Sequence, residues 1–129
     1  MEPHPIKVLL VDDEAGYINI LARRMMRREF QVQKAYNGSE AIKILRKNEF
    51  DVAVLDLKME DMDGIEVLKI FKKMDPDLAV IMLTGHGSST AAKEGLDFGA
   101  DDYLIKPCEL DELISKIREA HEKRRKNVS

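Results

Sequence analysis

Two hydrophobic patterns alternate along the whole chain. Short apolar runs are followed by longer stretches in which apolar positions recur every three or four residues. Runs of the first kind are typical of buried strands, and stretches of the second kind are typical of amphipathic helices. The predicted strands are residues 6–11, 30–35, 52–55, 78–83 and 102–105, and the predicted helices are residues 15–29, 39–49, 64–74, 88–99 and 109–126.

This alternation predicts a parallel sheet. Strands that are each separated by a helix need crossover connections, which place the helices on the faces of the sheet. The runs "VAVL" and "LAVIML" are wholly apolar, as expected of strands covered on both faces, whereas "FQVQKA" alternates and is expected at an edge. The predicted fold is therefore α/β, a doubly wound five-stranded parallel sheet with helices on both faces.

Composition and charge fit one soluble domain. The chain has 129 residues, of which 44% are hydrophobic and 35% charged, enough for a core of its own. We expect a tail at residues 1–5, the domain at 6–123, and at 124–129 a basic tail or the start of a linker. The net charge of −3 gives no electrostatic reason to expect nucleic-acid binding.

The same features predict a cytoplasmic protein. No apolar run approaches the length of a membrane span, and no basic segment precedes the first apolar run as it would in a signal peptide. The single cysteine, Cys108, excludes an internal disulfide and a multi-cysteine metal site. We expect Cys108 to be a small packing residue, and Met25, Met26 and Met82 to fill the core.

Polar side chains follow four of the predicted strands. The first strand ends in Asp12 and Asp13, the third in Asp56, the fourth in Thr84 and the fifth in Lys106. The carboxyl ends of parallel strands share one edge of the sheet, and ligands of open α/β sheets bind there. Three carboxylates, one hydroxyl and one ammonium group are therefore expected to converge.

This set of groups predicts a phosphoryl-transfer site. Close carboxylates either raise their own pKa values or hold a cation, and oxygen-only donors suit Mg²⁺, for which Mn²⁺ could substitute. A magnesium ion with Thr84 and Lys106 would clamp a phosphoryl group, and a carboxylate held beside it can accept that group. Asp56, which stands alone at the end of a central strand, is the predicted acceptor.

Each of these residues also has an ordinary structural interpretation. Asp12 and Asp13 can cap the following helix, and Thr84 can do the same for the helix after it. Asp56 can be an ordinary turn residue, Lys106 can point into solvent, and Tyr103 can be a partly buried core residue. The arginines at 23, 24, 27 and 28 lie outside the apolar face of their helix, where a solvated surface is the favoured interpretation.

Four motifs in this order resemble the receiver domain of response regulators in two-component (histidine–aspartate phosphorelay) signalling. They are "VDDE", "VLDLKMEDMDG", "LTGHG" and "DDYLIKP", and the resemblance extends from Ile6 to about Lys123. It implies the strand order 2-1-3-4-5 and Asp56 as the phosphoacceptor. It also implies Mg²⁺ ligands from Asp12, Asp13, Asp56 and the backbone carbonyl of Lys58, and contacts from Thr84 and Lys106 to the phosphoryl oxygens.

Further roles follow from the resemblance alone. Thr84 and Tyr103 would form the conformational switch, and the Lys106-Pro107 peptide bond would be cis. Lys58 and His86 would line the rim of the site, where we expect Lys58 to slow hydrolysis of the phosphorylated form. The family usually has Met-Pro after the acceptor, whereas this chain has Met59-Glu60, a departure that touches no reacting group and would loosen the loop.

The implied function is a signalling switch that catalyses only its own phosphorylation and dephosphorylation. A histidine kinase or a phosphotransfer protein would supply the phosphoryl group in a Mg²⁺-dependent reaction. An output partner or domain would be controlled through the face formed by residues 84–123, without direct contact to nucleic acid or membrane. The resemblance also allows a homodimer that forms on phosphorylation.

Three other functions remain as alternatives. A phosphatase or mutase of the haloacid-dehalogenase type would need an aspartate two residues after the nucleophile, where this chain has Lys58. A flavodoxin-like FMN binder would need a phosphate loop after the first strand, where the acids of "DDEA" would repel the phosphate. A receiver-like module that is never phosphorylated is disfavoured by the complete set of five site residues.

Overall fold

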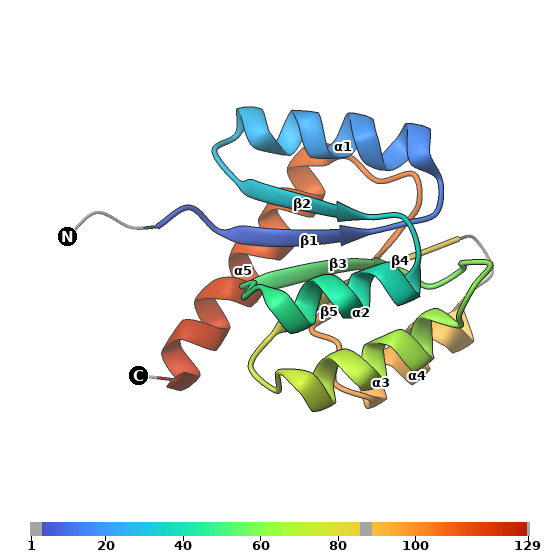
Figure 1. Ribbon diagram of the computed structural model, residues 1–129. Coiled ribbons are helices and arrows are strands. Elements are labelled where there is room, and N and C mark those ends of the chain that lie inside the picture. The colour runs from blue at the N-terminus through green and yellow to red at the C-terminus, as the bar shows by residue number, and fades with distance from the viewer. Residues whose placement is uncertain (1–3, 86–88, 129) are drawn as a thin grey trace.

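Five parallel strands form one sheet in the order β2-β1-β3-β4-β5, which confirms the predicted topology. The structure is a computed structural model that describes residues 4–85 and 89–128 (Figure 1). Its strands are β1 (Lys7–Val11), β2 (Gln31–Ala35), β3 (Val52–Asp56), β4 (Ala79–Thr84) and β5 (Asp102–Ile105). Its helices are α1 (Ala15–Arg27), α2 (Gly38–Lys47), α3 (Gly64–Met74), α4 (Ser89–Asp97) and α5 (Leu110–Val128).

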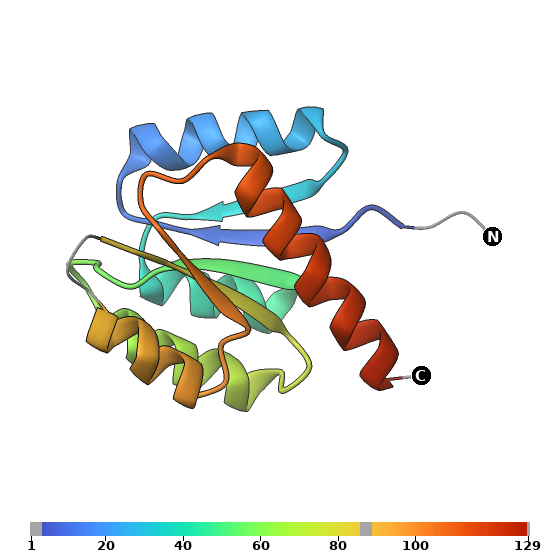
Figure 2. The same ribbon diagram turned by 180° about the vertical axis from the view of Figure 1, so that it is seen from behind.

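The helices cover both faces of the sheet, as predicted. Helices α1 and α5 lie on one face and α2, α3 and α4 on the other, as the two opposite views show (Figures 1 and 2). Alternate residues of β1 belong to the two cores: Val8 and Leu10 pack with α1 and α5, and Leu9 and Val11 pack with α2 and α3. This division explains why the central strands are apolar at every position. The alternating strand, β2, is an edge strand as expected.

Helix starts lie at the same edge of the sheet as the strand ends. Asn37 caps α2 by accepting a hydrogen bond from the Glu40 N–H at 2.8 Å, and Asp63 caps α3 by accepting one from the Ile65 N–H at 2.9 Å. These caps end the preceding loops at defined residues, because they satisfy backbone N–H groups that the helix itself leaves free. The loops after β2 and β3 therefore end at capped residues.

Three sequence expectations can be compared with the packing. Cys108 is half-buried against the α1/α5 core, which confirms its packing role, and Met25 and Met82 are fully buried. The prediction for Met26 was wrong: it is 52% exposed, because the residue after Met25 is turned away from the buried stripe of α1.

The last helix extends further than the expected domain boundary at residue 123. Helix α5 continues to Val128, and Arg124, which was assigned to a tail, forms an ion pair with Asp101 at 3.0 Å. Asp101 precedes β5, so this contact ties the end of α5 to the sheet. Among the helices of residues 4–85 and 89–128, none is long and apolar enough to cross a membrane.

Candidate functional site

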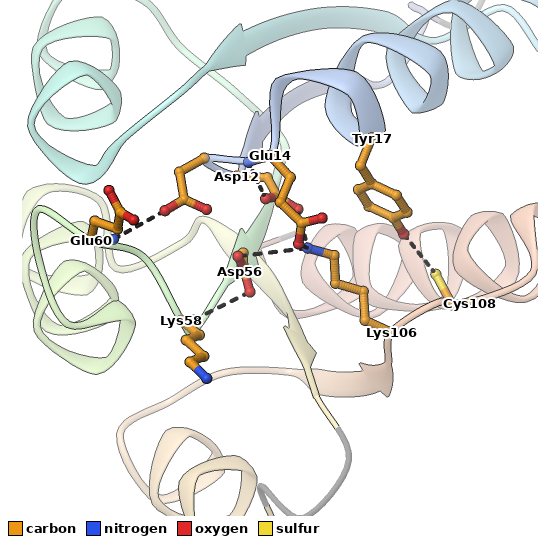
Figure 3. Close-up of polar contacts among 9 residues, drawn as sticks. Asp12, Glu14, Tyr17, Asp56, Lys58, Glu60, Lys106 and Cys108 are labelled. Carbon is orange, nitrogen blue, oxygen red and sulfur yellow. Dashed lines mark hydrogen bonds and ion pairs between the residues drawn. The ribbon is translucent and has the colours of Figure 1, made fainter.

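The carboxyl ends of four strands bring the predicted residues to one edge of the sheet. Figure 3 shows Asp12, Asp56 and Lys106 from three of these strand ends pointing toward one another. Asp12, Asp56 and Thr84 are all at most 4% exposed, and they are the buried polar residues of the part of the chain that the structure describes. Burying ionisable groups is unfavourable unless they are paired or hold a cation, so their partners indicate what the site can do.

Three acids form a cluster suited to a hard cation. Asp12, Asp13 and Asp56 each offer a carboxylate oxygen, and these oxygens lie within 4.8 Å of one another. Asp12 Oδ2 is buried and has no hydrogen-bond partner among residues 4–85 and 89–128. It lies 2.8 Å from Lys106 Nζ, so it is ion-paired but has an acceptor position to spare. An all-oxygen set of this kind fits Mg²⁺.

A backbone N–H group orients each carboxylate. The Glu14 N–H donates to Asp12 Oδ1 at 2.9 Å, and the Lys58 N–H donates to Asp56 Oδ1 at 3.2 Å. The third donor is the Glu60 N–H, which lies 3.0 Å from Asp13 Oδ2. Each carboxylate is thus held through one oxygen, which favours a fixed arrangement of the other three oxygens.

Lys106 provides the positive charge of the site. Its Nζ atom lies 2.8 Å from Asp12 Oδ2, 2.6 Å from Glu14 Oε1 and 3.7 Å from Asp56 Oδ2. Burial lowers the pKa of Lys106, but its close contacts with Asp12 and Glu14 raise it by more, so the pKa lies above its ordinary value and the lysine stays charged. The solvent-facing interpretation of Lys106 was therefore wrong, since its side chain is only 14% exposed.

The sequence interpretation missed two contacts of this lysine. Glu14 directly follows the predicted acidic pair, and Tyr17 presents its ring to Lys106 Nζ at 4.7 Å from the centroid. The Tyr17 hydroxyl oxygen in turn lies 3.7 Å from Cys108 Sγ. Glu14 is the N-cap of α1 with an extended backbone, so helical spacing does not link it to Tyr17 and no sequence pattern indicates either contact.

The environment of Asp56 makes its charged form less favourable than it is in water. Burial raises the pKa of Asp56 to about 6, and the negative charge of Asp12 also raises it. The Lys58 N–H and the Lys106 ammonium group act in the opposite direction. A cation bound between these carboxylates would favour the charged form that a nucleophile requires.

The two expected switch residues lie in different surroundings. The Thr84 hydroxyl is buried and donates to the Leu104 carbonyl oxygen at 3.5 Å, within the β4–β5 pair. Tyr103, on β5, is 39% exposed, so it is not the core tyrosine of the alternative interpretation. The Lys106-Pro107 bond is cis, as expected.

The two expected rim residues are less defined. The Lys58 side chain is exposed and extends away from the Asp56 carboxylate in Figure 3, so its backbone N–H and not its ammonium group meets the acid. His86 lies outside the described residues. The shielding roles of both residues stay predictions.

Sequence comparisons identify relatives for most of the chain. A sequence model of the response regulator receiver domain matches residues 8–118. The response regulator MprA of Mycobacterium sp. (strain KMS) is 37% identical over 114 residues, which cover 88% of this chain and 50% of that protein. The transcriptional regulatory protein GlrR of Escherichia coli (strain K12) is 33% identical over 122 residues, covering 95% of this chain and 28% of that protein. The chain thus spans half or less of the length of these relatives.

Two solved receiver domains show the same architecture along almost their whole length. A response regulator receiver domain protein (CheY-like) from Methanospirillum hungatei JF-1 has a TM-score of 0.91 at 28% identity, covering 95% of this chain and 98% of that one. The receiver domain of the Francisella response regulator 1452 has a TM-score of 0.84 at 34% identity, covering 92% and 98%. With five parallel strands in the matching order and an acidic cluster at their ends, this chain belongs to the response regulator receiver domain family.

Proposed function

We propose that this domain accepts a phosphoryl group on Asp56 from a phosphohistidine of a histidine kinase or a phosphotransfer protein. The observation that carries the proposal is the position of Asp56 itself. Its buried carboxylate lies in a cluster with Asp12 and Asp13, and Lys106 Nζ is 3.7 Å from its Oδ2 atom. A nucleophilic carboxylate, a cation site and a lysine are the parts that such a transfer requires.

The chemistry assigns a step to each group. Asp12, Asp13, Asp56 and the backbone carbonyl of Lys58 would hold Mg²⁺, which when bound neutralises the acids and polarises the phosphoryl oxygens. An Asp56 oxygen attacks the phosphorus while the phosphorus–nitrogen bond to the donor histidine breaks. The bonding electron pair returns to the imidazole nitrogen, and the phosphoryl group becomes an acyl phosphate on Asp56.

Lys106 and Thr84 would respond to the new charge. Lys106 already lies between Asp12, Glu14 and Asp56, so a small movement of its Nζ atom would bring it to a phosphoryl oxygen. Thr84 would exchange its long hydrogen bond to the Leu104 carbonyl for one to the phosphoryl group. Tyr103 would then move into the space beside Thr84 and carry the change to the output face.

The wider roles follow from the same proposal. The domain would comprise residues 6–123 of a cytoplasmic response regulator, and an output partner or domain would read the face formed by residues 84–123. The domain would act as a switch and not as an enzyme with a separate substrate. A homodimer formed on phosphorylation is a further outcome of this proposal.

Phosphorylation by a small donor tests the proposal. Wild-type protein with acetyl phosphate and Mg²⁺ should gain one phosphoryl group, measured by intact mass, and Asp56→Asn should gain none while remaining folded. Asp13→Ala, or excess EDTA, should suppress the gain in the wild type. Robust phosphorylation of Asp56→Asn at another residue would contradict the acceptor, and unchanged phosphorylation in EDTA would contradict the cation site. A wild type that never gains phosphate would favour a binding module.

A further inference from the structure

The loop between β3 and α3, residues 57–63, touches the acidic cluster through its backbone as well as through Asp56. The Glu60 N–H donates to Asp13 Oδ2 at 3.0 Å (Figure 3). The donor is main-chain, so any residue except proline at position 60 can supply it. The proline that usually occupies this place in the resembled family could not make the bond. Having Glu60 in place of the family's usual proline therefore affects Asp13, a proposed cation ligand.

The residue after Glu60 fastens the same loop to a different element. Asp61 Oδ1 accepts the Gly38 N–H at 3.0 Å, and Asp61 Oδ2 accepts the Ser39 N–H and the Ser39 hydroxyl, each at 3.1 Å. Both N–H groups belong to the first turn of α2, where they lack partners within the helix and favour a negative charge. Asp61 thus anchors the loop to the start of α2.

The loop is also closed at its base. The Gly64 N–H donates to the Leu57 carbonyl oxygen at 3.1 Å, and a Cβ atom at position 64 would lie only 2.4 Å from Leu57 Cα. Three attachments, at Leu57, at Asp61 and at Asp13, therefore leave little freedom for the short segment that carries the Glu60 N–H.

We propose that the main-chain N–H of Glu60 is a positioning group for Asp13, and that Asp61 sets the place of this group by tying the loop to α2. The inference deepens the proposed function and rests on it, because it assumes that Asp13 is a cation ligand. A carboxylate held through one oxygen loses less freedom when its other oxygen binds a cation. Partners of this kind commonly change metal affinity by about 10-fold or more.

A pair of substitutions at one position separates the N–H from the side chain. Glu60→Pro removes the donor, whereas Glu60→Ala removes only the carboxylate. Mg²⁺ dissociation constants can be measured by following backbone amide shifts in an NMR titration, with the melting temperature as a check on folding. We expect Glu60→Ala to stay within about twofold of the wild type and Glu60→Pro to bind about 10-fold more weakly. A folded Glu60→Pro that binds Mg²⁺ as Glu60→Ala does would overturn the inference.

Two further measurements keep the test informative if Glu60→Pro does not fold. The Glu60 amide proton should exchange slowly in the wild type and in Asp13→Asn, which keeps an acceptor, and much faster in Asp13→Ala. Asp61→Ala should weaken Mg²⁺ binding several-fold, whereas Ser39→Ala, which keeps both backbone donors, should not. Equal exchange in Asp13→Ala and wild type, or unchanged Mg²⁺ affinity in Asp61→Ala, would reject the role. If the wild type binds no Mg²⁺, the proposed function fails. If the wild type binds Mg²⁺ and the Glu60→Pro and Asp61→Ala variants bind it equally well, only this inference fails.

Discussion

Lys106 and Glu14 are 92 residues apart in the chain, yet Lys106 Nζ lies 2.6 Å from Glu14 Oε1. The pair joins the residue after β5 to the residue before α1. The Glu14 side chain is 65% exposed, so solvent screening limits the contribution of this pair to stability to about 1 kcal/mol or less. The ion pair matters more for function than for stability, because Glu14 binds the lysine that would contact the phosphoryl group.

Glu14→Gln should accelerate phosphorylation by acetyl phosphate. The substitution frees Lys106 for the phosphoryl group and removes a negative charge near the anionic donor, and both effects have the same sign. Loss of a competing interaction of up to about 1 kcal/mol corresponds to an increase of up to about fivefold in rate. Initial rates of mass gain would measure it, with Glu119→Gln on the exposed surface of α5 as the charge-matched control. A slower reaction in Glu14→Gln would show that Glu14 assists Lys106.

Asp56→Asn should stabilise the domain in metal-free buffer at neutral pH. The pKa of Asp56 is raised from 3.8 to about 6, first by burial and then by Asp12, so the folded state binds this proton more tightly than the unfolded state. The contribution of Asp56 to the free energy of unfolding therefore falls as pH rises through this interval and is constant above it. Asparagine does not ionise, so it does not cause this loss of stability as pH rises. The variant should therefore be about 1–2 kcal/mol more stable than the wild type at pH 7 and nearly as stable as the wild type at pH 4.

Urea unfolding of both proteins in EDTA across this pH interval measures the difference. Adding Mg²⁺ should narrow this difference in stability, because the wild type keeps all three carboxylates and should bind the cation more tightly than Asp56→Asn. A less stable Asp56→Asn at pH 7 in EDTA would mean that the carboxylate stabilises the cluster and does not strain it.

Arg124→Ala should destabilise the domain by about 1–2 kcal/mol. Arg124 binds both oxygens of Asp101, with Nε at 3.2 Å and Nη2 at 3.0 Å, and Asp101 is only 7% exposed. Removing one partner leaves a buried carboxylate without its counter-charge. Arg125→Ala, whose exposed side chain pairs with Glu122, is the control and should change stability little. A chain that ends at Lys123 tests the proposed boundary: it should still fold, and it should lose no more stability than Arg124→Ala.

Gly64→Ala and Gly16→Ala should have opposite effects on thermal unfolding. A Cβ atom at position 64 would lie 2.4 Å from Leu57 Cα and 2.7 Å from the Leu57 carbonyl oxygen, so the backbone of the loop must move. We expect a loss of about 1–3 kcal/mol there. At position 16, within α1, a Cβ atom meets nothing within 4 Å, and alanine should add about 0.5–1 kcal/mol through its helix propensity. Equal melting temperatures for the two variants would contradict the tight base of the loop.

Beryllofluoride, which mimics a phosphoryl group, should shift the amide signals of residues 84–108 most strongly. Thr84 holds the Leu104 carbonyl by a long bond, and α4 buries only Ala92 and Gly95 in the described structure. An element with so few buried contacts is easily displaced. Shift changes confined to α1 and α2 would contradict a switch through Thr84 and Tyr103.

Most of the fold and the convergence of the site were predictable from sequence. The apolar runs indicate the strands, and parallel strands must end at one edge, so the sequence alone places Asp12, Asp56, Thr84 and Lys106 together. Contacts that depend on local side-chain direction could not be obtained in this way. The periodicity of α1 does not predict that Met26 is exposed, and no sequence pattern predicts that Glu14 contacts Lys106.

Backbone hydrogen bonds in loops were even harder to predict from the sequence. The bond from the Glu60 N–H to Asp13 depends on the path of a loop, and hydrophobic periodicity carries no information about such a path. Likewise, nothing in the sequence indicates that Arg124, which lies beyond the expected boundary at 123, pairs with the buried Asp101.

The stacking of Lys106 on Tyr17 gives the domain an optical reporter of its own. The chain has three tyrosines and no tryptophan, so its ultraviolet emission is not masked by indole fluorescence. Of the three, Tyr17 has its ring 4.7 Å from the ammonium group that faces the acids. Any event that draws this ammonium group towards Asp56 changes the electric field at the ring. Tyrosine fluorescence of the unlabelled protein should therefore change when the site becomes occupied.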